Sequence, residues 1–244
     1  MSTDAVKYRF DGGIATLRID DGKRNALSPT VLGAIYRALD EAEADGAAVI
    51  ITGREDVFSA GFDLKVMKRG GKEAVRMLQQ GFALTARVLH HPYPVVAACN
   101  GHVMAMGVFL MLSADYVIGT RGDFKVAANE VAIGLTMPRV AAAMLNHRLN
   151  PAAYQRAAIL SEVFDVESAR TAGFFDELVE PGELESRAES CAQAFSELDQ
   201  HAHTATKRRL RRRLVRRIRW SIPLDLIDAM MIGLRASRGR RKTR

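Results

Sequence analysis

The sequence predicts an α/β protein that alternates strands and helices in its first half and is mostly helical in its second. Nearly half of the 244 residues (48%) are hydrophobic, which is enough for one large core. From Pro138 onward, apolar residues recur at helical spacing. In the first half, stretches with helical spacing alternate with short apolar runs, and such runs are typical of buried strands. These runs are 14–19, 48–52, 95–99 and 116–119.

Ordinary start and stop signals bound the helices expected in the first half. Ser28 is suited to cap the first helix, and Pro29 is suited to its first position. A second helix is expected over 73–89, ending at the proline-containing segment 91–94. A glycine-containing turn then leads to an apolar helix at about 105–112.

The second half is expected to add helices and one short strand. The strand is predicted at 175–179. The helices are predicted at 151–160, 166–172, 183–198, 204–219 and 224–235. No flexible linker interrupts the chain. We therefore expect a core over 1–200 and a C-terminal helical region with a basic tail over 201–244, both within one domain.

Composition argues against a membrane-spanning or secreted protein. No uninterrupted apolar run of about 18 residues occurs, so no membrane span is expected. Residues 1–8 carry charges and lack the apolar stretch of a signal peptide. Cys99 and Cys191 both lie in apolar segments and are far apart in sequence. We therefore expect them to be buried free thiols, as is usual in a reducing compartment. A cytoplasmic location is the expectation.

Positive charge is concentrated near the C-terminus of a chain whose net charge is +7. One basic cluster spans 207–219 and another spans 235–244. Such clusters suggest nucleic acid, anionic lipid or phosphorylated ligands, and the alternative is a solvated helix face or tail. We favour the solvated reading for the tail and leave the first cluster open. Nucleic acid is not an expected partner, because Trp220 is the only aromatic residue near the first cluster.

Metal and serine-hydrolase chemistry find no support in the sequence. The histidines lack the spacing of metal ligands, so no metal site is expected. Ser28 and Ser59 lack the context of a nucleophile elbow.

Two strand-to-turn junctions, 57–65 and 95–107, contain small residues and glycines. Such residues let a main chain approach a ligand closely, and free N–H groups there can hold a developing negative oxygen. Either junction alone is a weak signal, because a glycine after a strand is usually a simple turn.

Taken together and in order, several segments resemble the enoyl-CoA hydratase/isomerase (crotonase) family over roughly residues 8–200. These segments are Asn25–Ser28, Phe58–Lys65, Asn100–Asp115, Asn129–Gly134 and Ala169–Val179. The resemblance implies a crotonase-like spiral of ββα units with a helical C-terminal oligomerisation region, assembled as a homotrimer or hexamer. It also implies an acyl-CoA or enoyl-CoA substrate, with coenzyme A as part of that substrate and no separate cofactor.

The resemblance assigns an oxyanion hole to the backbone N–H groups of Phe62 and Met106. Met106 lies near the start of an apolar helix, where free N–H groups favour an anion. For coenzyme A, the resemblance places Ala60 and Leu64 at the adenine. The basic candidates for its phosphates are Lys23, Arg24 and Lys65, and the alternative for these three is ordinary solvated charge.

Two carboxylates usually perform hydration in the family, and this chain matches only one of them, Glu130. Phe109 stands at the other position. Glu130 lies in a mostly apolar run, 126–135, where desolvation would raise its pKa into the range of a base. The alternative is a surface glutamate in a loop.

A single carboxylate favours isomerisation over hydration. Moving a proton from C2 to C4 through an enolate needs one group, whereas hydration conveniently uses two. The family's mitochondrial Δ3,Δ2-enoyl-CoA isomerases look similar here, with Asn-Glu and an apolar residue at the position of Phe109. Enoyl-CoA hydratase of β-oxidation and a non-catalytic acyl-CoA binder remain alternatives. An apolar stripe at Leu210, Leu214 and Ile218 predicts helix packing between subunits.

Overall fold

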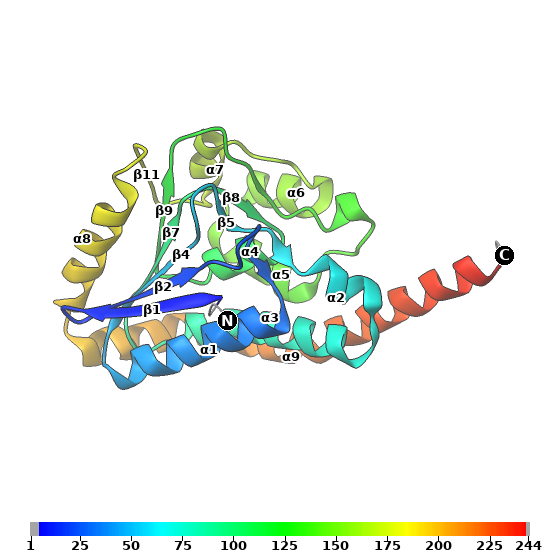
Figure 1. Ribbon diagram of the computed structural model, residues 1–244, viewed down its shortest axis with the longest axis horizontal. Helices are drawn as coiled ribbons and strands as arrows, with labels where there is room; N and C mark the ends of the chain where they lie inside the picture. Colours follow the sequence, from blue (N-terminus) through cyan, green and yellow to red (C-terminus); the bar gives the residue numbers. More distant parts are fainter. Residues whose placement is uncertain (1–4, 243–244) are drawn as a thin grey trace.

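A six-stranded sheet runs through the computed structural model, which describes residues 5–242 and, up to residue 232, their side chains (Figure 1). The strand order is β1-β2-β4-β7-β9-β11, with an antiparallel first pair and parallel pairs thereafter. The strands are β1 (Val6–Asp11), β2 (Ile14–Ile19), β4 (Ala48–Thr52), β7 (Val95–Cys99), β9 (Tyr116–Thr120) and β11 (Glu177–Val179). The first four residues and the side chains of the tail at 235–244 lie outside this description.

Two smaller sheets stand beside the large one. A three-stranded parallel sheet has the order β10-β8-β5, and a parallel pair joins β3 to β6. Their strands are β3 (Ala26–Leu27), β5 (Val57–Ser59), β6 (Gly61–Phe62), β8 (His102–Met104) and β10 (Val126–Ala127). Strands β5, β8 and β10 each follow a strand of the large sheet. Helical structure comes directly after β8 and β10, and after the short strand β6 in the case of β5. This repetition is the predicted spiral of ββα units, which is thereby confirmed.

Helices cover both faces of the large sheet. Helix α8 packs on one face, against the side chains of Ile50 and Val96, while Val49 and Ile51 point into the main core on the other. This alternation is the period of two expected of a strand. The helices are α1 (Pro29–Ala44), α2 (Leu64–Arg69), α3 (Gly71–Leu89), α4 (Met106–Met111), α5 (Arg139–Arg148), α6 (Pro151–Leu160), α7 (Val166–Ala172), α8 (Leu184–Ser196) and α9 (Gln200–Lys242). None of the helices among the described residues is long and apolar enough to cross a membrane.

Helix α9 corrects the expectation of two helices, 204–219 and 224–235, because it continues through Pro223 (Figure 1). A proline inside a helix removes one hydrogen bond and costs about 3 kcal/mol. Helix α9 packs on α3 and α5. Two residues beyond the proline, buried Asp225 accepts the backbone N–H groups of Arg139 and Val140, each at 2.9 Å. These contacts hold the chain helical on both sides of Pro223.

A buried ion cluster anchors the first half of α9. Lys207 Nζ lies 2.6 Å from Asp115, and Arg211 Nη1 lies 2.7 Å from the same carboxylate. Asp115 also accepts the backbone N–H of Val95 at the start of β7. Burial lowers the pKa of Lys207 to about 8, against the opposing effect of Asp115. Two cations of the basic cluster therefore have a structural partner inside the chain.

Candidate active site

The turn between β2 and β3 is fixed to the end of β5 by the side chain of Asn25. Buried Asn25 has a positive φ of 52°. Its Nδ2 donates to the carbonyl of Ile19 at 2.8 Å and to that of Phe58 at 3.2 Å. The backbone N–H of Ala60 then donates to the carbonyl of Arg24 at 3.0 Å. The structure thus places the predicted coenzyme A residues Arg24 and Ala60 side by side.

The other predicted coenzyme A residues lie on the segments that join here. Lys23 precedes Arg24 in the same exposed turn. Leu64 and Lys65 begin α2, directly after β6, and both are exposed. Asp63 caps that helix by accepting the backbone N–H of Lys65 at 2.7 Å. All five residues are accessible to a ligand.

Gly61 brings the two predicted oxyanion segments into contact. Its φ is +85°, and a Cβ there would stand 2.9 Å from Ala105 Cβ and 3.1 Å from the backbone nitrogen of Met106. Only glycine fits both this conformation and this approach. The main chain that leads into Phe62 therefore lies directly against the turn that carries the amide of Met106.

Ala105 holds that turn in a strained conformation. Its φ of 48° and ψ of −124° lie in a region that residues other than glycine rarely adopt. Such strain costs about 1–3 kcal/mol and is concentrated at functional sites. The N–H of Ala105 donates to the carbonyl of Ala127 at 2.8 Å, which fixes the turn where α4 begins. The amide of Met106 is the first of α4, and first-turn N–H groups have no acceptor within their helix.

The ring of Phe62 packs against α3. It meets Phe82 edge to face, with ring centroids 5.8 Å apart. A Cβ on Gly81 would lie 2.3 Å from the Phe62 ring. Because Gly81 has no side chain, the ring fits against α3 at this position. Gly81 thereby fixes the residue whose N–H is a candidate donor, a role that the sequence analysis did not find.

Glu130 is a buried carboxylic acid without a hydrogen-bond partner for its Oε2 among the described residues. It follows β10 and opens the short 3-10 helix η1 (Val131–Ile133). Only 7% of the residue is exposed. Loss of solvation raises the pKa of Glu130 to about 7, in the direction that its apolar surroundings suggest. Such a group is part carboxylate and part acid at neutral pH, which suits it to accept and return protons.

Strand register brings Glu130 and Met106 to one end of the small sheet. β10 is parallel to β8, with Ala127 opposite Met104. Glu130 and Met106 follow these paired residues within two or three positions, so both leave the sheet on the same side. Phe109, one turn into α4, is 1% exposed and carries no titratable group.

No group of three or more His, Cys, Asp or Glu side chains in the described part of the chain could hold a metal ion. Cys99 and Cys191 are both buried free thiols.

Comparisons with known proteins show the family to which the chain belongs. The family model for enoyl-CoA hydratase/isomerase matches residues 9–224. A Mycobacterium avium protein named probable enoyl-CoA hydratase echA17 is 32% identical over 204 residues, which is 81% of this chain and 77% of that protein.

Solved structures give the same result. An enoyl-CoA hydratase/isomerase family protein from Pseudomonas syringae is 42% identical with a TM-score of 0.90, covering 92% of this chain and 97% of that one. A Mycobacterium tuberculosis protein is also 42% identical, with a TM-score of 0.88 and coverage of 93% and 99%. It is named an enoyl-CoA isomerase in that structure and a probable enoyl-CoA hydratase, EchA3, in another. The chain belongs to the enoyl-CoA hydratase/isomerase (crotonase) family. It is an acyl-CoA enzyme of the hydratase/isomerase class.

Proposed function

We propose that the protein is an enoyl-CoA isomerase that moves a double bond through a thioester enolate, with Glu130 as its only proton carrier. The Glu130 carboxylate removes a proton from C2 of a 3-enoyl-CoA, and the electron pair of the C2–H bond enters the thioester. The backbone N–H groups of Phe62 and Met106 stabilise the resulting oxyanion. Protonated Glu130 then returns the proton to C4, which leaves 2-enoyl-CoA.

The observation that carries this proposal is the buried carboxyl group of Glu130, which lies at the same end of the small sheet as Met106 and whose pKa is raised to about 7. Hydration conveniently uses two groups, one to activate water and one to deliver a proton to C2, and the buried ring of Phe109 can do neither. The M. tuberculosis relative is named an enoyl-CoA isomerase in one structure and a probable enoyl-CoA hydratase in another, so its name admits both reactions. The relatives named hydratase keep hydration as the competing outcome of the test.

Coenzyme A is proposed to bind across the turn and helix that carry the five accessible residues. The side chains of Lys23, Arg24 and Lys65 would meet its phosphates, and Ala60 and Leu64 would line the adenine. The hydrogen bond between Ala60 and Arg24 supports this grouping, because it places the basic turn beside the predicted adenine site. A cytoplasmic location is proposed from the two buried free thiols.

A homotrimer or hexamer is proposed from the apolar end of α9. The prediction that an apolar stripe packs between subunits was partly wrong, because Ile218 is buried and Leu214 is half-buried within the chain. The exposed apolar side chains lie farther along the helix: Leu224, Ile227, Met230 and Met231. Such a row is rarely left to solvent. A monomeric mass by light scattering at micromolar concentration would contradict this proposal.

Separate assays with 3-enoyl-CoA and 2-enoyl-CoA test the reaction. The wild type should convert 3-enoyl-CoA to 2-enoyl-CoA with little hydration. Glu130→Gln keeps the side-chain shape and removes proton transfer, so turnover should fall by about 10²–10⁴-fold while acyl-CoA affinity is retained. The matched control is Glu189→Gln on α8, which covers the opposite face of the large sheet and should keep full turnover.

Other results would assign another function. Hydration of 2-enoyl-CoA that exceeds isomerisation would make the protein a hydratase. Tight acyl-CoA binding without turnover in the wild type would make it a binder. Unchanged turnover in Glu130→Gln would remove Glu130 from the mechanism.

A further inference from the structure

Helix α9 divides its cations between two faces. Lys207 and Arg211 lie on the inner face, together with buried Val215 and Ile218, and pack against the body of the protein. Seven arginines occupy the outer face between residues 208 and 219, and all are exposed: Arg208, Arg209, Arg212, Arg213, Arg216, Arg217 and Arg219. Six of them follow the spacing i, i+1, i+4, i+5, i+8, i+9, which forms a broad stripe along a helix.

This outer arginine face, as we call these seven residues, has no acidic partner in the described part of the chain. None of the seven lies within ion-pair distance of a carboxylate there, whereas the buried cations share Asp115. No acidic residue occurs from 200 to 224. Arginines at i and i+4, such as Arg209 and Arg213, also repel one another, which destabilises an isolated helix. The face therefore concentrates unneutralised charge.

The outer arginine face contributes strongly to the basic character of the protein. The formal net charge is +7, and these seven arginines lie on one helix without a carboxylate between residues 200 and 224. One side of α9 thus carries only positive charge over residues 208–219. A field of this sign attracts anionic surfaces and large polyanions.

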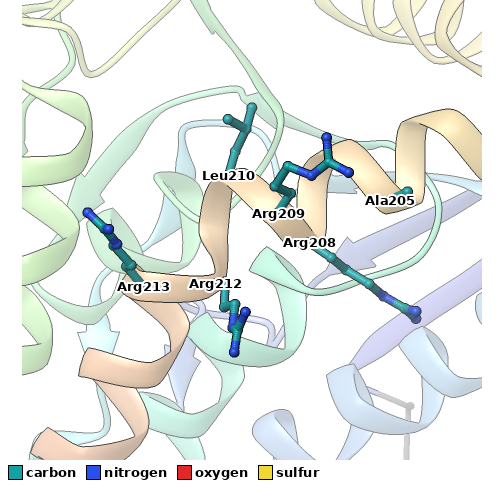
Figure 2. Close-up of a pocket in the computed structure, with 6 residues that line it drawn as sticks. All are labelled: Ala205, Arg208, Arg209, Leu210, Arg212 and Arg213. Atoms are coloured by element: carbon teal, nitrogen blue, oxygen red, sulfur yellow. The ribbon is translucent and has the colours of Figure 1, made fainter.

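The arginine side chains are spread rather than gathered around a small cavity. Figure 2 shows a shallow hollow lined by Ala205, Arg208, Arg209, Leu210, Arg212 and Arg213. All six residues come from α9, and the arginine side chains project in different directions from the helix. The hollow is the space between these side chains on an open outer surface. It suits an extended anionic partner better than a single small ligand.

We propose that the outer arginine face binds the protein to an anionic phospholipid surface, with α9 lying parallel to it. Arginines pair with lipid phosphates, and clusters of this size on a helix are typical of contacts with anionic lipid. Leu210 and Trp220 border the face and are each 76% exposed. Such apolar side chains can enter the headgroup region, and tryptophan is favoured at that depth.

A nucleic acid fits the same charges less well. Single-stranded binding uses several aromatic platforms, and Trp220 is the only exposed aromatic side chain on the described part of α9. The observations therefore favour a lipid surface.

Co-sedimentation of the full-length protein with phosphatidylcholine vesicles, with and without phosphatidylglycerol, tests the proposal. Binding should require phosphatidylglycerol and should be lost near 1 M salt, where the screening length is about 3 Å. The triple variant Arg209→Gln, Arg212→Gln, Arg216→Gln should bind about 100-fold more weakly, at about fivefold per arginine. Its isomerase activity and oligomeric mass should be unchanged.

The matched control removes three exposed arginines elsewhere: Arg37→Gln, Arg76→Gln and Arg170→Gln. It lowers the net charge equally and should bind vesicles as the wild type does. Equal loss of binding in both triple variants would show that net charge alone drives the contact and would overturn the proposal. The same holds for binding that ignores phosphatidylglycerol. A lower oligomeric mass in the α9 variant, or arginine-dependent binding of RNA or DNA without vesicle binding, would also overturn it.

Discussion

Glu130→Gln should change the pH dependence of stability as well as turnover. In the folded protein, burial raises the pKa of Glu130 from 4.5 to about 7. Between these two values the folded state holds a proton that the unfolded chain releases. The stability associated with this proton is therefore present below pH 4.5 and is lost as pH rises through about 7. Glutamine has no proton to lose and should not show this dependence.

The expected size follows from the two pKa values. A tenfold change in proton affinity corresponds to about 1.4 kcal/mol, so the full effect is about 3 kcal/mol, of which about 2.5 kcal/mol falls between pH 5 and pH 8. The wild type should lose that amount relative to Glu130→Gln as pH rises over this range. The free energy of unfolding of Glu130→Gln minus that of the wild type should therefore be larger at pH 8 than at pH 5.

Urea unfolding of both proteins at pH 5, 6, 7 and 8, at one protein concentration, measures this difference. Other buried groups differ in protonation between the folded and unfolded states in part of this window, including His91, whose pKa burial lowers from 6.5 to about 4. Their contributions cancel when the two proteins are compared at each pH. A stability difference that stays constant from pH 5 to pH 8 would refute the reasoning, because it would mean that Glu130 is not desolvated in the folded protein.

Two further substitutions test contacts that hold the site and α9 in place. Gly81→Ala should lower isomerase kcat and destabilise the fold by about 1–3 kcal/mol, because its Cβ would lie 2.3 Å from the Phe62 ring. The control Gly33→Ala, whose nearest atom is 3.7 Å away, should be neutral or stabilising, and equal turnover in both variants would count against a positioning role for Gly81. Asp225→Ala should cost about 1–3 kcal/mol in urea unfolding, because it leaves two backbone N–H groups of α5 without their acceptor. Asp228→Ala, which loses only an exposed ion pair, should cost less than about 1 kcal/mol, and a similar loss in both would contradict the capping role.

Local sequence patterns were sufficient to predict the bounds of several strands and helices. The bounds predicted for β2, β4, β7, α6 and α7 agree with the structure. Each is a short apolar run or a helix with a capping residue at its start, such as Asn150 before α6 and Asp165 before α7. The strained turn at Ala105 also falls within the segment 100–115 that the resemblance assigned to the oxyanion hole. These features depend on neighbours in sequence.

Contacts between distant residues could not be predicted in this way. Asp225 caps α5 from a position 85 residues away from Val140, and Lys207 meets Asp115 across 92 residues. Pro223 signals a helix end in any local reading, and only the packing of α9 overrides that signal. The same limit hid the role of Gly81, since a glycine within a helical stretch gives no sign of the ring that lies against it.

The proposed use of one carboxyl group for both proton transfers places a specific demand on its pKa. A glutamate with the ordinary pKa of 4.5 would remain a carboxylate at pH 7 but would be a weak base towards C2. A carboxyl group with a pKa well above 7 would be protonated before the reaction and unable to remove the first proton from C2. A pKa of about 7 satisfies both requirements, and burial alone produces it here. Phe109 stands at the position of the second family carboxylate, and its buried ring supplies no competing acid. In this proposal, the absence of a second carboxylate and the raised pKa of Glu130 both favour isomerisation over hydration.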